Sequence, residues 1–144
     1  MQYLSLKKRI KNNEGFSLKP YKDQLGFYTI GYGHLIKKNE GFYFNKKYKK
    51  THFEELFEKD FKMAINAYFS FFKKKKFDKK TKYLLIEMIF QMGIKKVLCF
   101  KKMLNNIDKK NYYLVALEMM DSLWFKQTPK RVEEMIYNYI KNDN

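Results

Sequence analysis

Hydrophobic residues recur every three or four positions over most of the chain, which predicts amphipathic helices. A first short helix is predicted before Gly15, which can end it by adopting the left-handed conformation. Thr51 and Glu54 have the spacing of a capping box at the start of a longer helix. The apolar stripe of that helix comprises Phe53, Leu56, Phe57, Phe61, Ile65 and Tyr68.

The helical periodicity continues to the end of the chain. Asp78 can cap a helix that is apolar nearly all round, which is typical of a helix buried in the middle of a bundle, and Gly93 can end it. Two more helices are predicted, one around residues 97–104 and one around residues 112–119. The last helix begins where Pro129 occupies the first helical position after a capping threonine.

The segment from Ser17 to about Tyr43 has a different pattern, because it combines turn signals with β-branched and aromatic runs. It predicts a strand over residues 17–22, a turn at 23–26, and strands near 27–31 and 34–36. Five of the six glycines of the chain fall between residues 15 and 43. These features predict a small antiparallel sheet.

The length of 144 residues suits one domain with a substantial core. The predicted fold is α+β and mainly α, with a sheet lobe (about 15–50) joined by a long helix to a helical-bundle lobe (about 51–144 plus the N-terminal helix). Cys99 allows no internal disulfide, and its apolar helix face predicts a buried thiol. We find no apolar run typical of a signal peptide or a membrane span, so we expect synthesis in a cytoplasm.

The net charge of +16 suggests nucleic-acid binding as an alternative function, because a basic chain rich in aromatic residues can bind nucleic acid. Only Arg9 and Arg131 among the 31 cationic residues are arginines, and the Lys-rich composition resembles the residue bias of an A+T-rich genome. We therefore expect no specific nucleic acid as partner. The charge would still draw the protein toward anionic envelopes.

Three polar residues suggest chemistry. Glu14 ends the first predicted helix, and Asp23 and Thr29 lie on either side of the predicted hairpin turn, so the three could face one another across a cleft. Glycoside hydrolysis needs two such carboxyl groups, one to protonate the leaving oxygen and one that stays ionised, while a hydroxyl could hold the attacking water. By spacing alone, two solvated surface carboxylates are the alternative. We find no metal-site spacing of His, Cys or carboxylates, and expect no metal or cofactor.

The residues around these three, Asn13–Asp23 and Gly26–His34, closely resemble the lysozyme family of the T-even bacteriophages, glycoside hydrolase family 24. Two further motifs of that family, Ile89–Gly93 and Trp124–Arg131, follow in the family's order, and the resemblance covers roughly residues 5–139. It implies a lysozyme-like fold and an N-acetylmuramidase. Such an enzyme cleaves the β-1,4 bond after N-acetylmuramic acid in bacterial peptidoglycan, with inversion at the anomeric carbon.

The resemblance also implies roles for single residues. Glu14 would be the general acid, Asp23 the charge stabiliser or water-positioning base, and Thr29 the group that holds water. The residues expected to bind sugar are Gly33, Leu35, Phe90 and Gln91.

Three further residues are expected to support the site. His34 would pair with Asp60 rather than act in catalysis, and Arg131 would pair with Glu14. The rarity of arginine agrees with the second pair, because the planar guanidinium grips a carboxylate bidentately. Trp124 is expected to anchor the packing of the helical lobe. The stretch from His34 to Thr51 is shorter than in the T-even enzymes, which removes part of one cleft lip.

The expected partner is bacterial peptidoglycan, reached after release from the host cytoplasm by a partner protein that opens the inner membrane. The chain is expected to act as a monomer. A catalytically inactive wall-binding module of the same fold is the second reading, and nucleic-acid binding the third. Use of the domain by a living cell for wall remodelling also stays open.

Overall fold

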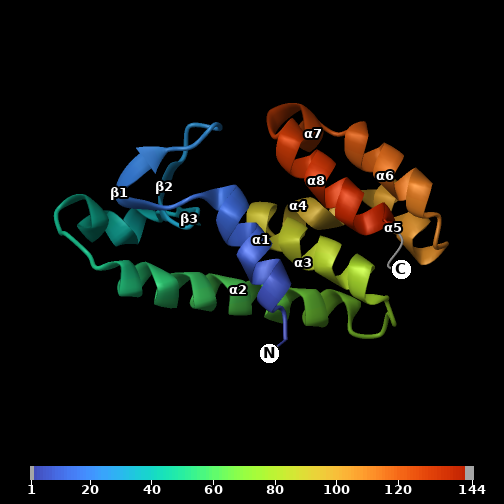
Figure 1. Ribbon diagram of the computed structural model, residues 1–144, viewed down its shortest axis with the longest axis horizontal. Helices are drawn as coiled ribbons and strands as arrows, with labels where there is room; N and C mark the ends of the chain where they lie inside the picture. Colours follow the sequence, from blue (N-terminus) through green and yellow to red (C-terminus); the bar gives the residue numbers. More distant parts are fainter. Residues whose placement is uncertain (1, 142–144) are drawn as a thin grey trace. The chain divides into compact units, whose positions relative to one another are not determined.

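The computed structural model describes residues 2–141, which divide into two compact units within one helix, between Met63 and Ala64. The described residues are mainly helical with one small antiparallel sheet (Figure 1). This confirms the predicted α+β, mainly α class. None of the described helices has the length and hydropathy that a membrane span requires.

The first unit contains the sheet and the helices around it. Its elements are α1 (Leu4–Glu14), β1 (Ser17–Lys22), β2 (Tyr28–Gly31), β3 (His34–Leu35), the 3-10 helix η1 (Lys38–Phe44) and the first part of α2 (Lys50–Phe72). The strand order is β1-β2-β3, antiparallel throughout, with an irregularity between Ser17 and Tyr21. The predicted strands and the turn between the first two are therefore present.

One face of the sheet is covered by an aromatic core. Ile30, Tyr43 and Phe53 are its buried members, and they come from β2, η1 and α2. In α1, Leu6 and Ile10 are completely buried. The first part of α2 therefore packs against the sheet lobe through Phe53, and α1 contacts it through the rings of Tyr3 and Phe61.

Polar contacts fix α1 along α2. The Lys11 ammonium donates to Glu54 at 2.6 Å, and the Tyr32 hydroxyl donates to the other oxygen of Glu54 at 2.6 Å. The bond to Lys11, followed by the bond to Tyr32, lowers the pKa of Glu54, while the bond to Glu54 raises the pKa of Tyr32 to about 12. The predicted capping box is wrong, because α2 begins at Lys50 and the Glu54 carboxylate binds side chains of other elements.

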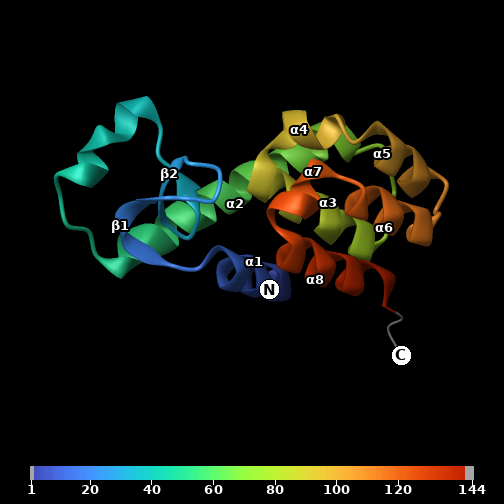
Figure 2. The same cartoon turned by 90° about the horizontal axis from the view of Figure 1, so that it is seen from above.

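The second unit is a helical bundle. Besides the rest of α2 it contains α3 (Lys79–Met92), α4 (Ile94–Leu98), α5 (Lys101–Asp108), α6 (Tyr112–Met120), α7 (Leu123–Gln127) and α8 (Pro129–Ile140). α3 packs against α4 and α8, and α8 packs against α6 (Figure 2). Every side chain from Leu84 to Ile89 is buried, which confirms that α3 is a central helix. Asp78 caps it as predicted, by accepting a 2.9 Å bond from the Thr81 amide.

Four local expectations need correction. The helix predicted around residues 97–104 is two helices, α4 and α5, and the short α7 was not predicted. Cys99 is exposed rather than buried, because α4 ends beside it and its thiol donates to the Lys95 carbonyl while Val97 faces the core. Gly15 ends α1 at positive φ, but its ψ of −170° lies outside the left-handed helical region.

Gly31 provides a test of sheet packing. Its φ is +65°, and a Cβ added there would lie 2.8 Å from the Phe53 ring. Gly31→Ala should lower the free energy of unfolding by about 2–4 kcal/mol, of which about 1 kcal/mol is backbone strain and the rest overpacking. Gly26→Ala is the matched control, because its φ is +85° with nothing within 4 Å. Urea unfolding measures both variants, and equal losses would show that Phe53 moves aside without cost.

Candidate functional site

Asp23 is fixed by the turn between β1 and β2. Its Oδ1 accepts hydrogen bonds from the amides of Leu25 and Phe27, both at 2.9 Å. The backbone closes the same turn, because the Gly26 amide donates to the Asp23 carbonyl at 3.0 Å. Aspartate favours such turns through these side-chain to backbone bonds. Within residues 2–141 the second carboxylate oxygen, Oδ2, accepts no hydrogen bond, so it can face a ligand.

Thr29 lies in the middle of the sheet. It pairs with Tyr21 on β1 and with Leu35 on β3, so these three side chains share one face. Thr29 is 4% exposed, and its hydroxyl donates to the Phe27 carbonyl at 3.1 Å. Leu35 is 51% exposed beside it. This face therefore presents a buried hydroxyl oxygen next to an open apolar side chain.

Glu14 is the last residue of α1, and its side chain is half-buried. Its carboxyl group lies directly over Gly33 in the turn between β2 and β3, where a Cβ would come within 2.6 Å of the Glu14 carboxyl carbon. Gly33 also has a φ of +73°. Gly33 was predicted from the resemblance as a residue that lets a glycan approach. Gly33 has a second role that was not predicted. Its missing side chain leaves the space that the Glu14 carboxyl group occupies.

Tyr21 links the two carboxylates. Burial raises the pKa of Tyr21, and the negative charges of Glu14 and Asp23 raise it further. Both carboxylates therefore lie within electrostatic reach of one phenol, whose residue pairs with Thr29. Tyr21 is thus paired with Thr29 and feels the charges of Glu14 and Asp23. Tyr21 was not predicted, although its place two residues before Asp23 on a strand was an available signal.

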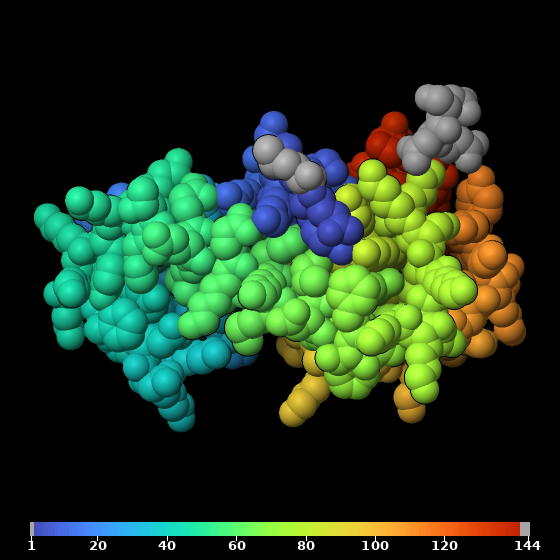
Figure 3. Space-filling view, turned by 90° about the horizontal axis from the view of Figure 1, so that it is seen from below, coloured from blue at the N-terminus to red at the C-terminus, as the bar shows by residue number. Residues whose placement is uncertain are grey.

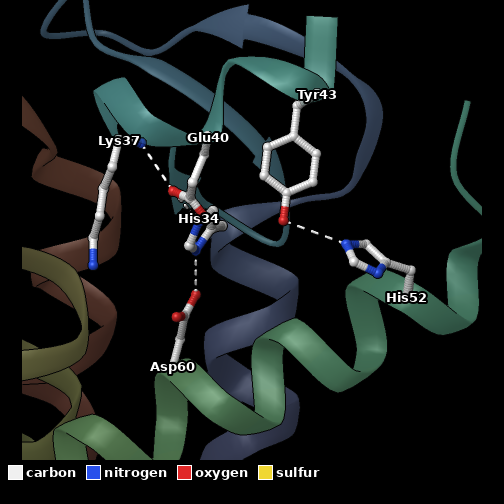
Figure 4. Close-up of polar contacts among 6 residues, drawn as sticks. All are labelled: His34, Lys37, Glu40, Tyr43, His52 and Asp60. Atoms are coloured by element: carbon white, nitrogen blue, oxygen red, sulfur yellow. Dashed lines mark hydrogen bonds and ion pairs between the residues drawn. The ribbon is translucent and has the colours of Figure 1, made fainter. Parts of the chain in front are cut away.

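His34 lies between two carboxylates (Figure 4). Its Nδ1 is 2.7 Å from Asp60 Oδ2, which is the pair that the resemblance implied, and its Nε2 is 3.2 Å from both oxygens of Glu40. Glu40 was not predicted. It also accepts a bond from the Lys37 amide at 2.9 Å. His34 therefore connects β3, η1 and α2, and we call this cluster the His34 clamp.

The charges in the His34 clamp stabilise one another. Burial acts to lower the pKa of His34, but the bonds and charges of Asp60 and Glu40 outweigh it and raise that pKa above the ordinary 6.5. Burial likewise acts to raise the pKa of Glu40, but the Lys37 amide and His34 lower it below 4.5. The ring nitrogens of His34 are both engaged, which suits a support role better than proton transfer to a substrate.

The other predicted site residues belong to the second unit. Phe90 and Gln91 lie in the last turn of α3 and are half-buried. Gln91 Oε1 is buried and accepts no hydrogen bond from the described residues. Arg131 lies in the first turn of α8 and is half-buried. The pairing of Arg131 with Glu14 stays a prediction. Trp124 is 7% exposed and contacts the ring of Phe100, as a packing residue would.

The first-unit arrangement supplies the groups of an acid-assisted hydrolysis. The Glu14 carboxyl lies at a helix end, and backbone amides hold the Asp23 carboxylate. The Thr29 hydroxyl donates its proton to a carbonyl, so its oxygen can accept a further hydrogen bond. Residues 2–141 hold no group of three or more His, Cys, Asp or Glu that could bind a metal ion.

Comparison with known proteins gives a family. The family model described as "Phage lysozyme" matches residues 11–137. Two similar proteins come from Dictyostelium discoideum and are named "Probable T4-type lysozyme 2" and "Probable T4-type lysozyme 1". They are 37% and 36% identical over 155 residues, and each alignment covers 92% of this chain and 91% of the relative.

The His34 clamp predicts a particular pH dependence of stability. Because the pKa of His34 is raised in the folded protein, His34 stabilises the fold fully below pH 6.5. This stabilisation is lost as the pH rises through the folded-state pKa of His34. Because the pKa of Glu40 is lowered in the folded protein, Glu40 stabilises the fold fully above pH 4.5. This stabilisation is lost as the pH falls through the folded-state pKa of Glu40. The clamp is therefore strongest between pH 4.5 and 6.5.

His34→Gln should cost about 1.5–3 kcal/mol of unfolding free energy at pH 5.5, the range for hydrogen bonds to charged groups, and less at pH 9. Urea unfolding of both proteins from pH 4 to 9 measures the difference. His52→Gln is the control, because the His52 ring meets the Tyr43 hydroxyl at 3.3 Å rather than a carboxylate. A His34→Gln loss that stays constant across this range would disprove the charged clamp.

Proposed function

The chain belongs to the phage lysozyme family, and from that premise we propose that it cleaves the β-1,4 bond between N-acetylmuramic acid and N-acetylglucosamine, with inversion at the anomeric carbon. Membership makes the chain a lysozyme, a glycoside hydrolase of the muramidase type whose substrate is peptidoglycan. The observation that carries the finer proposal is that Tyr21 pairs with Thr29 and feels the charges of Glu14 and Asp23.

Glu14 is the proposed general acid, which protonates the glycosidic oxygen as the bond breaks. Two features support this role. The carboxyl group lies at the C-terminal end of α1, where the helix dipole disfavours a negative charge and suits a group that must hold a proton. It also lies close to the backbone of Gly33, where only glycine leaves room for it.

Asp23 is the proposed ionised partner. The amides of Leu25 and Phe27 hold one of its oxygens, so the carboxylate keeps a fixed orientation while the other oxygen faces outward. A fixed negative charge stabilises the oxocarbenium-like transition state without rearrangement. The same carboxylate can take a proton from the attacking water, while Glu14 gives one to the leaving group, so the protons balance.

Thr29 is proposed to orient that water. Its hydroxyl proton is directed at the Phe27 carbonyl, so toward a water molecule the oxygen can only accept. A water that donates one hydrogen to Thr29 and the other to Asp23 has a lone pair free to attack the anomeric carbon. Burial of Thr29 keeps this geometry from relaxing.

Exposure supports a sugar-binding role for one predicted residue, Leu35. Leu35 offers an exposed apolar wall on the Thr29 face. Gln91 and Phe90, in the last turn of α3, are also proposed to bind sugar.

For the biological role, we propose lysis of a bacterial cell by a monomer that a membrane-opening partner releases to the wall. A second candidate is use by a cell for its own wall digestion or remodelling. The origin of both relatives in a cellular organism favours keeping this candidate. An inactive wall-binding module is the alternative that the activity assays test.

Glu14→Gln tests the acid. The amide keeps the size of the side chain but cannot give up a proton, so turnover should fall about 10²–10⁴-fold while peptidoglycan binding persists. Loss of turbidity and release of reducing ends measure turnover, and cosedimentation with purified peptidoglycan measures binding. Glu55→Gln, on an exposed position of α2, is the control. Near-normal turnover in Glu14→Gln would rule out its role as the acid.

Gly33→Ala tests whether the position of the Glu14 carboxyl group matters for turnover. The added methyl group would displace the Glu14 carboxyl, and a misplacement of about 1 Å can cost roughly 10²-fold in rate. Gly93→Ala is the control, since it has positive φ but nothing within 4 Å. Turnover should fall far more in Gly33→Ala than circular dichroism and thermal melting account for. If the two variants lose turnover equally, the contact with Glu14 has no catalytic importance.

A further inference from the structure

Three exposed aromatic rings lie on the η1 side of the first unit. Tyr28, Phe42 and Phe44 are 47%, 47% and 52% exposed, and the rings of Tyr28 and Phe44 meet edge to face at 5.4 Å. Successive residues of a 3-10 helix point about 120° apart, and Tyr43 faces the core, so Phe42 and Phe44 flank it on the outside. We call these three rings the aromatic surface.

The segment that carries Phe42 and Phe44 is rich in lysine. Residues 37–50 contain one carboxylate, Glu40, whose charge is taken up by His34. The same segment contains six exposed lysines, which are Lys37, Lys38, Lys46, Lys47, Lys49 and Lys50. From β1, the Lys22 ammonium lies 5.3 Å from the centre of the Tyr28 ring. Figure 3 shows the teal atoms of this segment as a continuous area on the surface of the first unit. The segment that carries two of the three rings is therefore strongly basic, and the third ring has Lys22 beside it.

The aromatic surface is separate from the proposed site. Tyr28 and Thr29 are successive residues of β2, so their side chains point to opposite faces of the sheet. Thr29 faces the proposed site, whereas Tyr28 faces η1. A partner on the aromatic surface would leave Glu14 and Asp23 open to their substrate.

We propose that the aromatic surface docks on an anionic phospholipid bilayer. Lysines complement the charge of an anionic leaflet, and aromatic side chains favour the boundary between headgroups and acyl chains. The two phenylalanines decide between a bilayer and an anionic wall polymer. A phenyl ring has no hydrogen-bonding group and gains from an apolar phase, which a bilayer offers and a hydrated polymer does not.

Cosedimentation of the full chain with vesicles tests the proposal. Wild type should bind phosphatidylglycerol vesicles at least tenfold more tightly than phosphatidylcholine vesicles, and rising salt should weaken that binding. Phe42→Ala/Phe44→Ala should reduce binding about tenfold. The control is Phe69→Ala/Phe71→Ala on α2, where the rings are 40% and 55% exposed. The control should bind within twofold of wild type.

A charge variant keeps the test decisive if the ring variant misfolds. Lys46→Gln/Lys47→Gln should weaken binding to phosphatidylglycerol vesicles about 25-fold, at roughly fivefold per lysine near an anionic leaflet. The matched control, Lys73→Gln/Lys74→Gln, removes two exposed lysines of the second unit. Circular dichroism checks the fold of each protein. Turnover on isolated peptidoglycan should stay within twofold for every variant, so vesicle binding and hydrolysis fail independently.

Three results would overturn the docking proposal. The first is equal binding to anionic and neutral vesicles. The second is an equal effect of each variant and its control. The third is binding to walls that carry anionic polymers, lost in Phe42→Ala/Phe44→Ala, with no vesicle binding by wild type. That last result would assign the aromatic surface to a wall polymer instead.

Discussion

The contact of the Glu14 carboxyl group with Gly33 is the constraint on which the proposed site depends. It sets the end of α1 against the turn between β2 and β3, and any side chain at position 33 would occupy the same space. A loop carboxylate would have many orientations, whereas this one ends a helix whose other contacts are fixed by Leu6 and Ile10 in the core. The packing of α1 thereby helps to position the acid.

Carboxylates of the first unit have distinct structural tasks, although the chain carries 31 cationic residues against 15 acidic ones. Glu54 connects α1 to α2 through Lys11 and to the sheet through Tyr32. Asp60 and Glu40 hold His34, and backbone amides hold Asp23. With lysine abundant everywhere, an ion pair to lysine gives little geometric precision. The bonds to histidine, tyrosine and backbone amides supply that precision instead.

Most patterns of short range were predicted correctly from the sequence, whereas most contacts between distant segments were found only in the structure. Periodicity predicted α2 and the central α3, and turn residues predicted the hairpin at Asp23. The cap at Asp78 was also predictable, because one side chain and one amide three residues later define it. Glu54 was assigned to a local cap, since nothing in its neighbourhood reveals that Tyr32 and Lys11 reach it. Cys99 was misplaced because one predicted helix is in fact two, and the break turns its thiol outward.

The proposed catalytic residues and the pair of His34 with Asp60 were predicted through the resemblance, while two supporting residues, Glu40 and Tyr21, were found only in the structure. Glu40 and Tyr21 have ordinary sequence contexts, and only the fold brings them to His34 and to the two carboxylates.

The central claim is that the Glu14 site cleaves after N-acetylmuramic acid, and the most direct test is the identity of the new reducing ends. Purified peptidoglycan is digested with the wild-type protein, and the fragments are reduced and analysed by mass spectrometry. Our account predicts N-acetylmuramic acid at every new reducing end, and N-acetylglucosamine at those ends would contradict it.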